Sequence, residues 1–227
     1  MHSLSVMLKP ASGQCNMHCD YCFYCDEMEQ RAQASYGFMS EETLQNVIRK
    51  TMLNADREIS FSYQGGEPTL AGLAFFEKAV ELQRKYNRKG IRVHNALQTN
   101  GYALNEKWCQ FFARHQFLIG LSIDGMQETH DAYRHGRILQ DKEQKTGQSR
   151  FRIPIESETC ETDIVQGQKN QTYERALHAA DLLTRYGVDF NILPVVNRQT
   201  AARIEDIYED YRRRGWKYQQ YIVCLPP

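Results

Sequence analysis

The chain has 227 residues, 41% of them hydrophobic, which is enough for one domain that buries its own core. Lys plus Arg and Asp plus Glu are balanced at 28 each, so bulk charge gives no reason to expect nucleic-acid binding. The N-terminal residues show no secretory signal pattern, no apolar run is long enough for a membrane span, and the cysteines number seven, an odd count. We therefore expect a cytoplasmic protein that does not bind membranes and whose cysteines remain reduced.

Short strand-like runs alternate along the chain with segments that carry apolar residues at helical spacing. The predicted strands are residues 4–10, 58–64, 91–99, 117–124, 188–196 and 218–225. The predicted helices are residues 40–53, 70–86, 105–115, 172–186 and 200–214. The first helix is expected to begin at Ser40, a typical N-cap residue. Strands alternating with helices favour parallel pairing through right-handed crossovers, so the sequence predicts an α/β protein with an open or closed (β/α) barrel.

A run of four cysteines, CNMHCDYCFYC at residues 15–25, directly follows the first predicted strand. Barrels of this kind place their chemistry at the carboxyl ends of the strands. Other informative motifs follow later strands: YQGGEP (63–68), QTNG (98–101), SIDG (122–125) and CLPP (224–227). We therefore expect these segments to meet at one mouth of the barrel.

The spacing of these cysteines leaves three kinds of site open. A structural zinc site is disfavoured, because Cys15, Cys19 and Cys22 form a C-x3-C-x2-C loop without a second separated pair. Four thiolates that include Cys25 would complete a closed electron-transfer cluster. Alternatively, Cys15, Cys19 and Cys22 alone would hold a cubane and leave one iron open to an external ligand. That last arrangement is typical of a catalytic cluster.

The cysteine loop is part of a wider set of motifs that match a known family. CNMHCDYCFY resembles the CxxxCxxC loop of the radical S-adenosylmethionine (SAM) superfamily. The segments KPASGQCNMHCDYCFY, SYQGGEPTLAGLAFFE, LQTNGYALNEKWCQFF, FLIGLSIDGMQETHDAYR and VDFNILPVVN together look like the anaerobic sulfatase-maturating enzymes. The match spans most of residues 5–135 and 172–225. The resemblance implies a partial (β/α)6 TIM-like barrel of the radical SAM type, truncated after the sixth strand.

The same resemblance implies a role for particular residues. Cys15, Cys19 and Cys22 would ligate a [4Fe-4S] cluster, whose open iron would be chelated by the amino and carboxylate groups of SAM. The positions that match SAM contacts are Tyr21, Gly66, Ser122, Arg134 and Leu225. Tyr24 and Gln64 match positions that face the substrate side chain.

Simple chemistry supports several of these assignments. Gly65 and Gly66 lack a Cβ atom, so the backbone can approach a ligand closely. Glu67 would supply negative charge near the ammonium of SAM. Arg134 would offer charge-assisted hydrogen bonds in a fixed fork.

The resemblance also implies an activity. One electron cleaves SAM to methionine and a 5′-deoxyadenosyl radical, which abstracts a hydrogen atom from the substrate. In sulfatase maturation, a cysteine or serine of a sulfatase polypeptide is oxidised to Cα-formylglycine. The implied partners are that polypeptide and an electron donor such as flavodoxin or ferredoxin.

The sequence departs from the family pattern in two places. Residues 137–168 form a polar insert where the family has a short connection. No auxiliary-cluster (SPASM) domain follows, so residues 1–227 are interpreted as a radical SAM core domain alone. Two alternative functions remain: a cluster- and SAM-binding fragment without turnover, and an electron-transfer iron-sulfur module.

Overall fold

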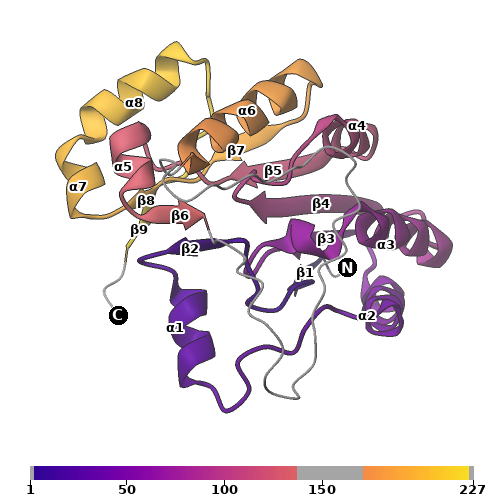
Figure 1. Ribbon diagram of the computed structural model, residues 1–227. Coiled ribbons are helices and arrows are strands. Elements are labelled where there is room, and N and C mark those ends of the chain that lie inside the picture. The colour runs from indigo at the N-terminus through magenta and orange to yellow at the C-terminus, as the bar shows by residue number, and fades with distance from the viewer. Residues whose placement is uncertain (1–2, 137–170, 225–227) are drawn as a thin grey trace.

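The computed structural model describes residues 3–136 and 171–224 (Figure 1). Its main sheet has five parallel strands in the order β1-β3-β4-β5-β7. These strands are β1 (Leu4–Leu8), β3 (Glu58–Tyr63), β4 (Arg92–Thr99), β5 (Phe117–Leu121) and β7 (Phe190–Ile192). The helices that connect them are α2 (Glu41–Asn54), α3 (Leu73–Tyr86), α4 (Glu106–Arg114) and α6 (Thr172–Arg185). The predicted parallel α/β architecture is confirmed.

A short two-stranded sheet, separate from the main sheet, contains part of the sixth predicted strand. β8 (Val195–Val196) pairs in parallel with β9 (Ile222–Val223), and Ile192 forms a bridge with Gln219. The predicted strand 188–196 is therefore divided into β7 and β8. Pro194 lies between them, and proline has no amide to donate to a ladder. Of the predicted strand 218–225, only Ile222–Val223 forms a strand and Gln219 an isolated bridge, and its last residue lies outside the described residues.

One face of the sheet forms the hydrophobic core. Along β3 the residues Ile59, Phe61 and Tyr63 are buried and Ser60 and Ser62 alternate with them. Figure 1 shows α2, α3, α4 and α6 along the outer side of the sheet, and their apolar side chains pack with the buried β3 residues in one cluster. Burying each such side chain stabilises the fold by about 1.5–3 kcal/mol. The alternate residues Ser60 and Ser62 therefore point to the opposite, inner face of the partial barrel.

Several local elements were not predicted from the sequence. They are β2 (Met17–Cys19), α1 (Phe23–Gln30), the 3-10 helix η1 (Pro68–Ala71), α5 (Gln127–Asp131) and β6 (Arg134–Gly136). The prediction of one helix over 200–214 is wrong, because the segment forms α7 (Arg198–Ala202) and α8 (Ile204–Arg213). α7 begins earlier because Asn197 caps it, accepting hydrogen bonds from the backbone of Gln199 and Thr200. By contrast, Ser40 caps α2 as predicted, accepting from the amide of Thr43.

The polar insert predicted at 137–168 lies outside the described residues. Within residues 3–136 and 171–224, no helix has the length and apolar character needed to cross a membrane.

Candidate functional site

The cysteine loop lies at the carboxyl end of the sheet, where β2 pairs antiparallel with β6 (Figure 1). Cys19 is opposite Arg134 in this pair, and the amide of Cys22 donates to the carbonyl of Cys19 at 2.9 Å. Cys22 then forms the N-cap of α1. The pairing with β6 fixes the middle of the loop, while Cys15 and Cys22 lie on the irregular segments on either side.

The start of the cysteine loop, at Gln14 and Cys15, packs against the turns that follow β3 and β4. The backbone amide of Glu67 donates to the carbonyl of Gln14 at 2.7 Å, and the side-chain Nδ2 of Asn100 lies 3.7 Å from Cys15 Sγ. Gly66 has φ +49°, and a Cβ at this position would collide with the carbonyl oxygen of Gln14. The structure therefore brings the GGEP and QTNG motifs together against the start of the cysteine loop.

The carboxylate of Glu67 is used by the protein itself. It is 1% exposed and accepts hydrogen bonds from the amide and hydroxyl of Thr69, from the Thr99 hydroxyl and from the amide of Asn100, at 2.7–3.0 Å. Burial raises the pKa of Glu67, and the bonds from Asn100 and Thr69 oppose that effect. The side chain joins the ends of β3 and β4. The expectation that Glu67 supplies negative charge near a ligand ammonium stays a prediction.

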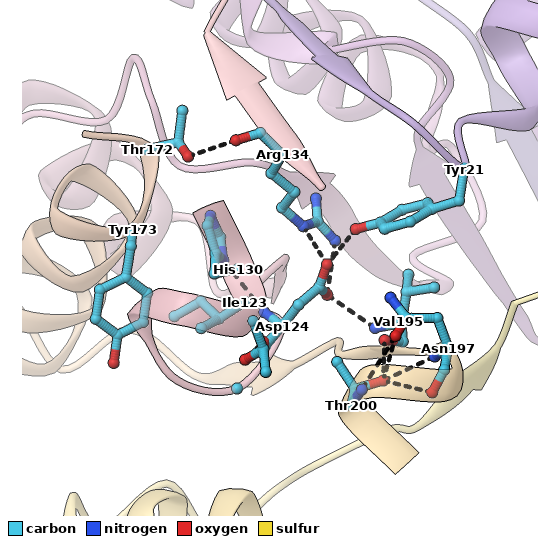
Figure 2. A network of polar contacts seen from close by, with 12 residues as sticks. Tyr21, Ile123, Asp124, His130, Arg134, Thr172, Tyr173, Val195, Asn197 and Thr200 are labelled. Carbon is cyan, nitrogen blue, oxygen red and sulfur yellow. Dashed lines mark hydrogen bonds and ion pairs between the residues drawn. The ribbon is translucent and has the colours of Figure 1, made fainter. Parts of the chain in front are cut away.

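The other side of the loop rests on a buried carboxylate, Asp124 (Figure 2). Arg134 donates to it from Nε at 2.7 Å and from Nη2 at 3.0 Å, and the Tyr21 hydroxyl also donates to it. The amide of Val195 completes the set at 2.8 Å. Burial is the largest single effect and would raise the pKa of Asp124. The charge and hydrogen bonds of Arg134, together with His130 and the Tyr21 hydrogen bond, outweigh burial and hold that pKa below its ordinary value. The fork expected to face a ligand is therefore directed at Asp124.

The three predicted ligands form a set of neighbouring thiols. Burial, with a smaller contribution from Glu67, raises the pKa of Cys15 to about 12. Burial also raises the pKa of Cys19 to about 11, and the charges of Cys15, Cys19 and Cys22 affect one another. Cys15, Cys19 and Cys22 form no disulfide. The raised pKa values keep the Cys15 and Cys19 thiols protonated at neutral pH, and both would release their protons on binding iron.

The donor set fits an iron-sulfur cluster better than a single ion. Three thiols on one loop are the ligands that iron in such clusters prefers. In the ranges 3–136 and 171–224, no three His, Cys, Asp or Glu side chains converge as a single bound metal ion would require. The zinc alternative therefore gains no support.

The two residues predicted to face a substrate lie beside the end of β1. Gln64 Nε2 is 2.8 Å from the sulfur of Met7, and the Lys9 ammonium lies 4.9 Å from the centre of the Tyr24 ring. Lys9 also packs against Gly65, because a Cβ built there would be 2.9 Å from Lys9 Cγ. Gln64 and Tyr24 thus share one side of the site, next to the glycine turn.

The remaining predicted SAM contacts lie at strand ends. The amide of Ser122 donates to the carbonyl of Thr99 at 3.0 Å, which places Ser122 just beyond β5 and two residues before Asp124. Leu225 lies outside the described residues. Tyr21 and Arg134 are joined through Asp124, and their side chains also lie close, with 5.6 Å between the guanidinium and the ring centre.

Sequence reasoning missed Asp124 and its neighbour His130. The motif SIDG contains Asp124, but an acidic residue after a strand is common and gave no signal of its own. His130 is 1% exposed; its Nδ1 accepts from the amide of Asp124 at 3.2 Å, and its Nε2 has no hydrogen-bond partner among the described residues. Burial, and then the charge of Arg134, lowers the pKa of His130 to about 3.

His130 should make folding stability dependent on pH. Its pKa is lower in the folded chain than in the unfolded chain, so its contribution is complete above about pH 6.5 and is lost as the pH falls toward about 3. Between about pH 7.5 and 5.5 we expect a loss of about 1.4 kcal/mol in the free energy of unfolding. Denaturant titration at both pH values measures this loss.

The variant His130→Gln should lack that pH-dependent loss, although it is less stable overall. His178→Gln, at an exposed position, is the matched control and should behave as the natural chain does. An equal pH dependence in His130→Gln and the natural chain would show that His130 is not the responsible group.

Fold and site together define a parallel α/β partial barrel that carries an iron-sulfur type cysteine loop at the carboxyl end of its strands. Residues 10–143 match the family model of the radical SAM superfamily, and the chain belongs to that superfamily. Members of this superfamily use a [4Fe-4S] cluster and SAM.

The chain is similar over its whole length to sulfatase-maturating enzymes. It is 38% identical to the cysteine-type anaerobic sulfatase-maturating enzyme of Clostridium perfringens, over 100% of this chain and 53% of that protein. It is 34% identical to the serine-type enzyme of Klebsiella aerogenes, over 95% of this chain and 45% of that protein. The chain thus spans about half the length of the curated relatives it matches.

Solved structures give the same result. Native anSMEcpe with bound AdoMet and Cp18Cys peptide matches with a TM-score of 0.80 at 37% identity, over 100% of this chain and 52% of that chain. Streptococcus suis SuiB bound to S-adenosylmethionine matches with a TM-score of 0.62 at 13% identity, over 99% of this chain and 41% of that chain, and shares the fold. The predicted partial barrel of the radical SAM type is confirmed.

Proposed function

We propose that Cys15, Cys19 and Cys22 hold a [4Fe-4S] cluster beside a SAM site, and that the chain carries out oxidation of the sulfatase-maturation type. The substrate would be a cysteine or serine of a sulfatase polypeptide, and the product Cα-formylglycine. One observation carries the proposal: three thiols on a loop that is held between the glycine turn after β3 and the Asp124 network after β5. The similarity to sulfatase-maturating enzymes supports the choice of substrate.

When bound, the cluster and SAM supply a carbon-centred radical that removes a hydrogen atom from the substrate. The chain contributes binding and orientation. Gly66 lets the backbone approach the ligand, and Tyr21, Ser122, Arg134 and Leu225 complete the proposed SAM contacts.

Tyr24 and Gln64 are proposed to face the substrate side chain. Both lie near the end of β1, and Tyr24 is close enough to Cys22 for the Cys22 charge to add to the effect of burial, which raises the pKa of Tyr24. The Tyr24 hydroxyl therefore stays protonated at neutral pH and can donate a hydrogen bond to a substrate.

The proposed partners follow from the same chemistry. A sulfatase polypeptide is the substrate, and a low-potential donor such as flavodoxin or ferredoxin supplies the electron. The cytoplasm is the proposed location, since reduced thiols are needed for cluster assembly. We also propose that residues 1–227 form a radical SAM core domain.

One observation favours a second candidate, the electron-transfer module. Cys25 lies close enough to Cys19 for its charge to contribute to the raised Cys19 pKa, after burial and several nearer charges. A fourth thiolate would close the cluster and leave no iron open to SAM.

SAM cleavage tests the proposed function. After anaerobic reconstitution and reduction with dithionite, the chain should convert SAM to 5′-deoxyadenosine, measured by liquid chromatography and mass spectrometry. A cysteine-containing sulfatase peptide in the same reaction should lose mass as formylglycine forms. The variant in which Cys15, Cys19 and Cys22 are all alanine is the negative control. No cleavage at full cluster occupancy would contradict the proposal and favour the electron-transfer module.

A further inference from the structure

Asp124 joins four separate parts of the chain. Its carboxylate accepts hydrogen bonds from Tyr21 of the cysteine loop, from Arg134 of β6 and from the amide of Val195 in β8, while Asp124 itself follows β5 (Figure 2). The Asp124 backbone is also fixed, because its carbonyl accepts from the Thr129 hydroxyl at 2.6 Å. Among the described residues, Asp124 is the one carboxylate that accepts hydrogen bonds from both Tyr21 and Arg134, the two predicted SAM contacts on this side of the cysteine loop.

Folding stability does not explain why a charged residue stands at position 124. Asp124 is 0% exposed and Arg134 is 6% exposed, and burying such a pair costs roughly as much solvation as the attraction returns. A pair of apolar residues could fill the same space at least as well. The directional fork, in contrast, fixes the orientation of the guanidinium in a way that apolar packing cannot.

The pair is also connected to the cluster loop. Arg134 is opposite Cys19 in the β2–β6 ladder, and the amide of Asp20 donates to the carbonyl of Tyr133 at 3.0 Å. Tyr21 follows directly on the same loop. A displacement of Asp124 would therefore change the position of Arg134 and of the Tyr21 ring at the same time.

We propose that Asp124 is a positioning residue of the cofactor site: through Arg134 and Tyr21 it sets the face of the cysteine loop that receives SAM. This inference rests on the proposed function, because it requires that SAM bind beside that loop. Asp124 itself does not touch the ligand. Its carboxylate oxygens are fully engaged by Tyr21, Arg134 and Val195.

A double-mutant cycle on reconstituted chains tests this role. Asp124→Asn retains an acceptor but turns an NH2 group toward the donors of Arg134 and Tyr21. We expect it to raise the dissociation constant for SAM roughly tenfold at unchanged iron content. In the Arg134→Gln background only the single hydrogen bond from Tyr21 still reaches Asp124 from the cysteine-loop side. There the same change should alter SAM affinity less than about twofold, because the two charge-assisted bonds of Arg134 carry most of the effect.

Two measurements are made on each variant: iron content, and the change in the cluster electron paramagnetic resonance spectrum as SAM is added. Asp210→Asn is the matched control, since it breaks a 2.7 Å ion pair between Asp210 of α8 and Arg214 just after that helix, away from the site. It should leave SAM affinity unchanged. A role of Asp124 in stability alone would lower the unfolding midpoint of Asp124→Asn without changing its SAM titration.

The outcomes separate this inference from the proposed function. If the natural chain holds the cluster and no spectral change follows SAM addition, both are wrong. If the natural chain responds and Asp124→Asn responds at the same SAM concentrations, the inference alone is wrong. Should Asp124→Asn fail to fold, Arg134→Gln is compared with the double variant that carries both Asp124→Asn and Arg134→Gln. The double variant has lost both members of the buried ion pair, so it contains no unpaired buried charge at these positions. A difference in SAM affinity beyond about fivefold would then overturn the inference.

Discussion

Anaerobic reconstitution with iron and sulfide should give about four irons per chain, and replacing Cys15, Cys19 or Cys22 by alanine should abolish that content. The effect is expected to be complete because the three thiols come from one short loop, and the described residues contain no group of three His, Cys, Asp or Glu side chains placed to hold a metal ion in their stead. Iron and acid-labile sulfide assays measure the cluster directly. The visible absorption of the reconstituted protein provides an independent measurement.

Cys25→Ser and Cys109→Ser are the matched controls for those replacements. Cys25 lies in the first turn of α1, beyond the loop, and Cys109 is buried in α4 within the hydrophobic core, so both should keep the full iron content. One zinc per chain without sulfide would contradict the cluster assignment. An essential Cys25 would instead favour the closed electron-transfer cluster.

Gly66→Ala is expected to weaken SAM binding about a hundredfold or more. A methyl group at this position would collide with the Gln14 carbonyl, and it would lie 2.7 Å from the carbonyl carbon of Gly13. Both neighbours are backbone, so either the cysteine loop or the glycine turn must move. The left-handed conformation at φ +49° adds strain for any side chain. SAM titration of the reconstituted variant measures the loss.

Gly72→Ala separates the collision from backbone strain. Gly72 also has a positive φ, +81°, but a Cβ there has no atom within 4 Å. This variant should lose about 1–3 kcal/mol of folding stability and keep its SAM affinity. If Gly66→Ala bound SAM as tightly as Gly72→Ala, the close approach of the glycine turn to the loop would have no part in ligand binding.

The main elements of the fold could be predicted because their signals are local. Alternating buried residues such as Ile59, Phe61 and Tyr63 mark a strand, and an N-cap such as Ser40 marks a helix start. The β2–β6 pair could not be predicted, because it joins Cys19 to Arg134 through tertiary structure and its strands have three residues each. Strands that short carry no periodic pattern.

The sequence predicted which motifs meet at the candidate site, but it did not predict the contacts between them. The motifs that contain Cys15, Gly66 and Arg134 do come together at the carboxyl end of the sheet. What the sequence could not reveal is which polar groups satisfy one another. Glu67 and Asp124 both serve protein donors, and only the hydrogen bonds of the folded chain distinguish such a carboxylate from one that faces a ligand.

The pairing of β1 with β3 has a consequence for the order of folding. Leu4 is matched with Ile59, so this contact closes a long loop that contains all four clustered cysteines. The pairs β3 with β4 and β4 with β5 close shorter loops, each spanned by one α-helix. Because contacts of low sequence separation form faster, the β3–β5 region should form first and β1 should dock late. During synthesis the cysteines would therefore leave the ribosome well before the surface that holds them exists, and would stay exposed to oxidants and to competing metals until β6, the partner strand of the loop, has been made.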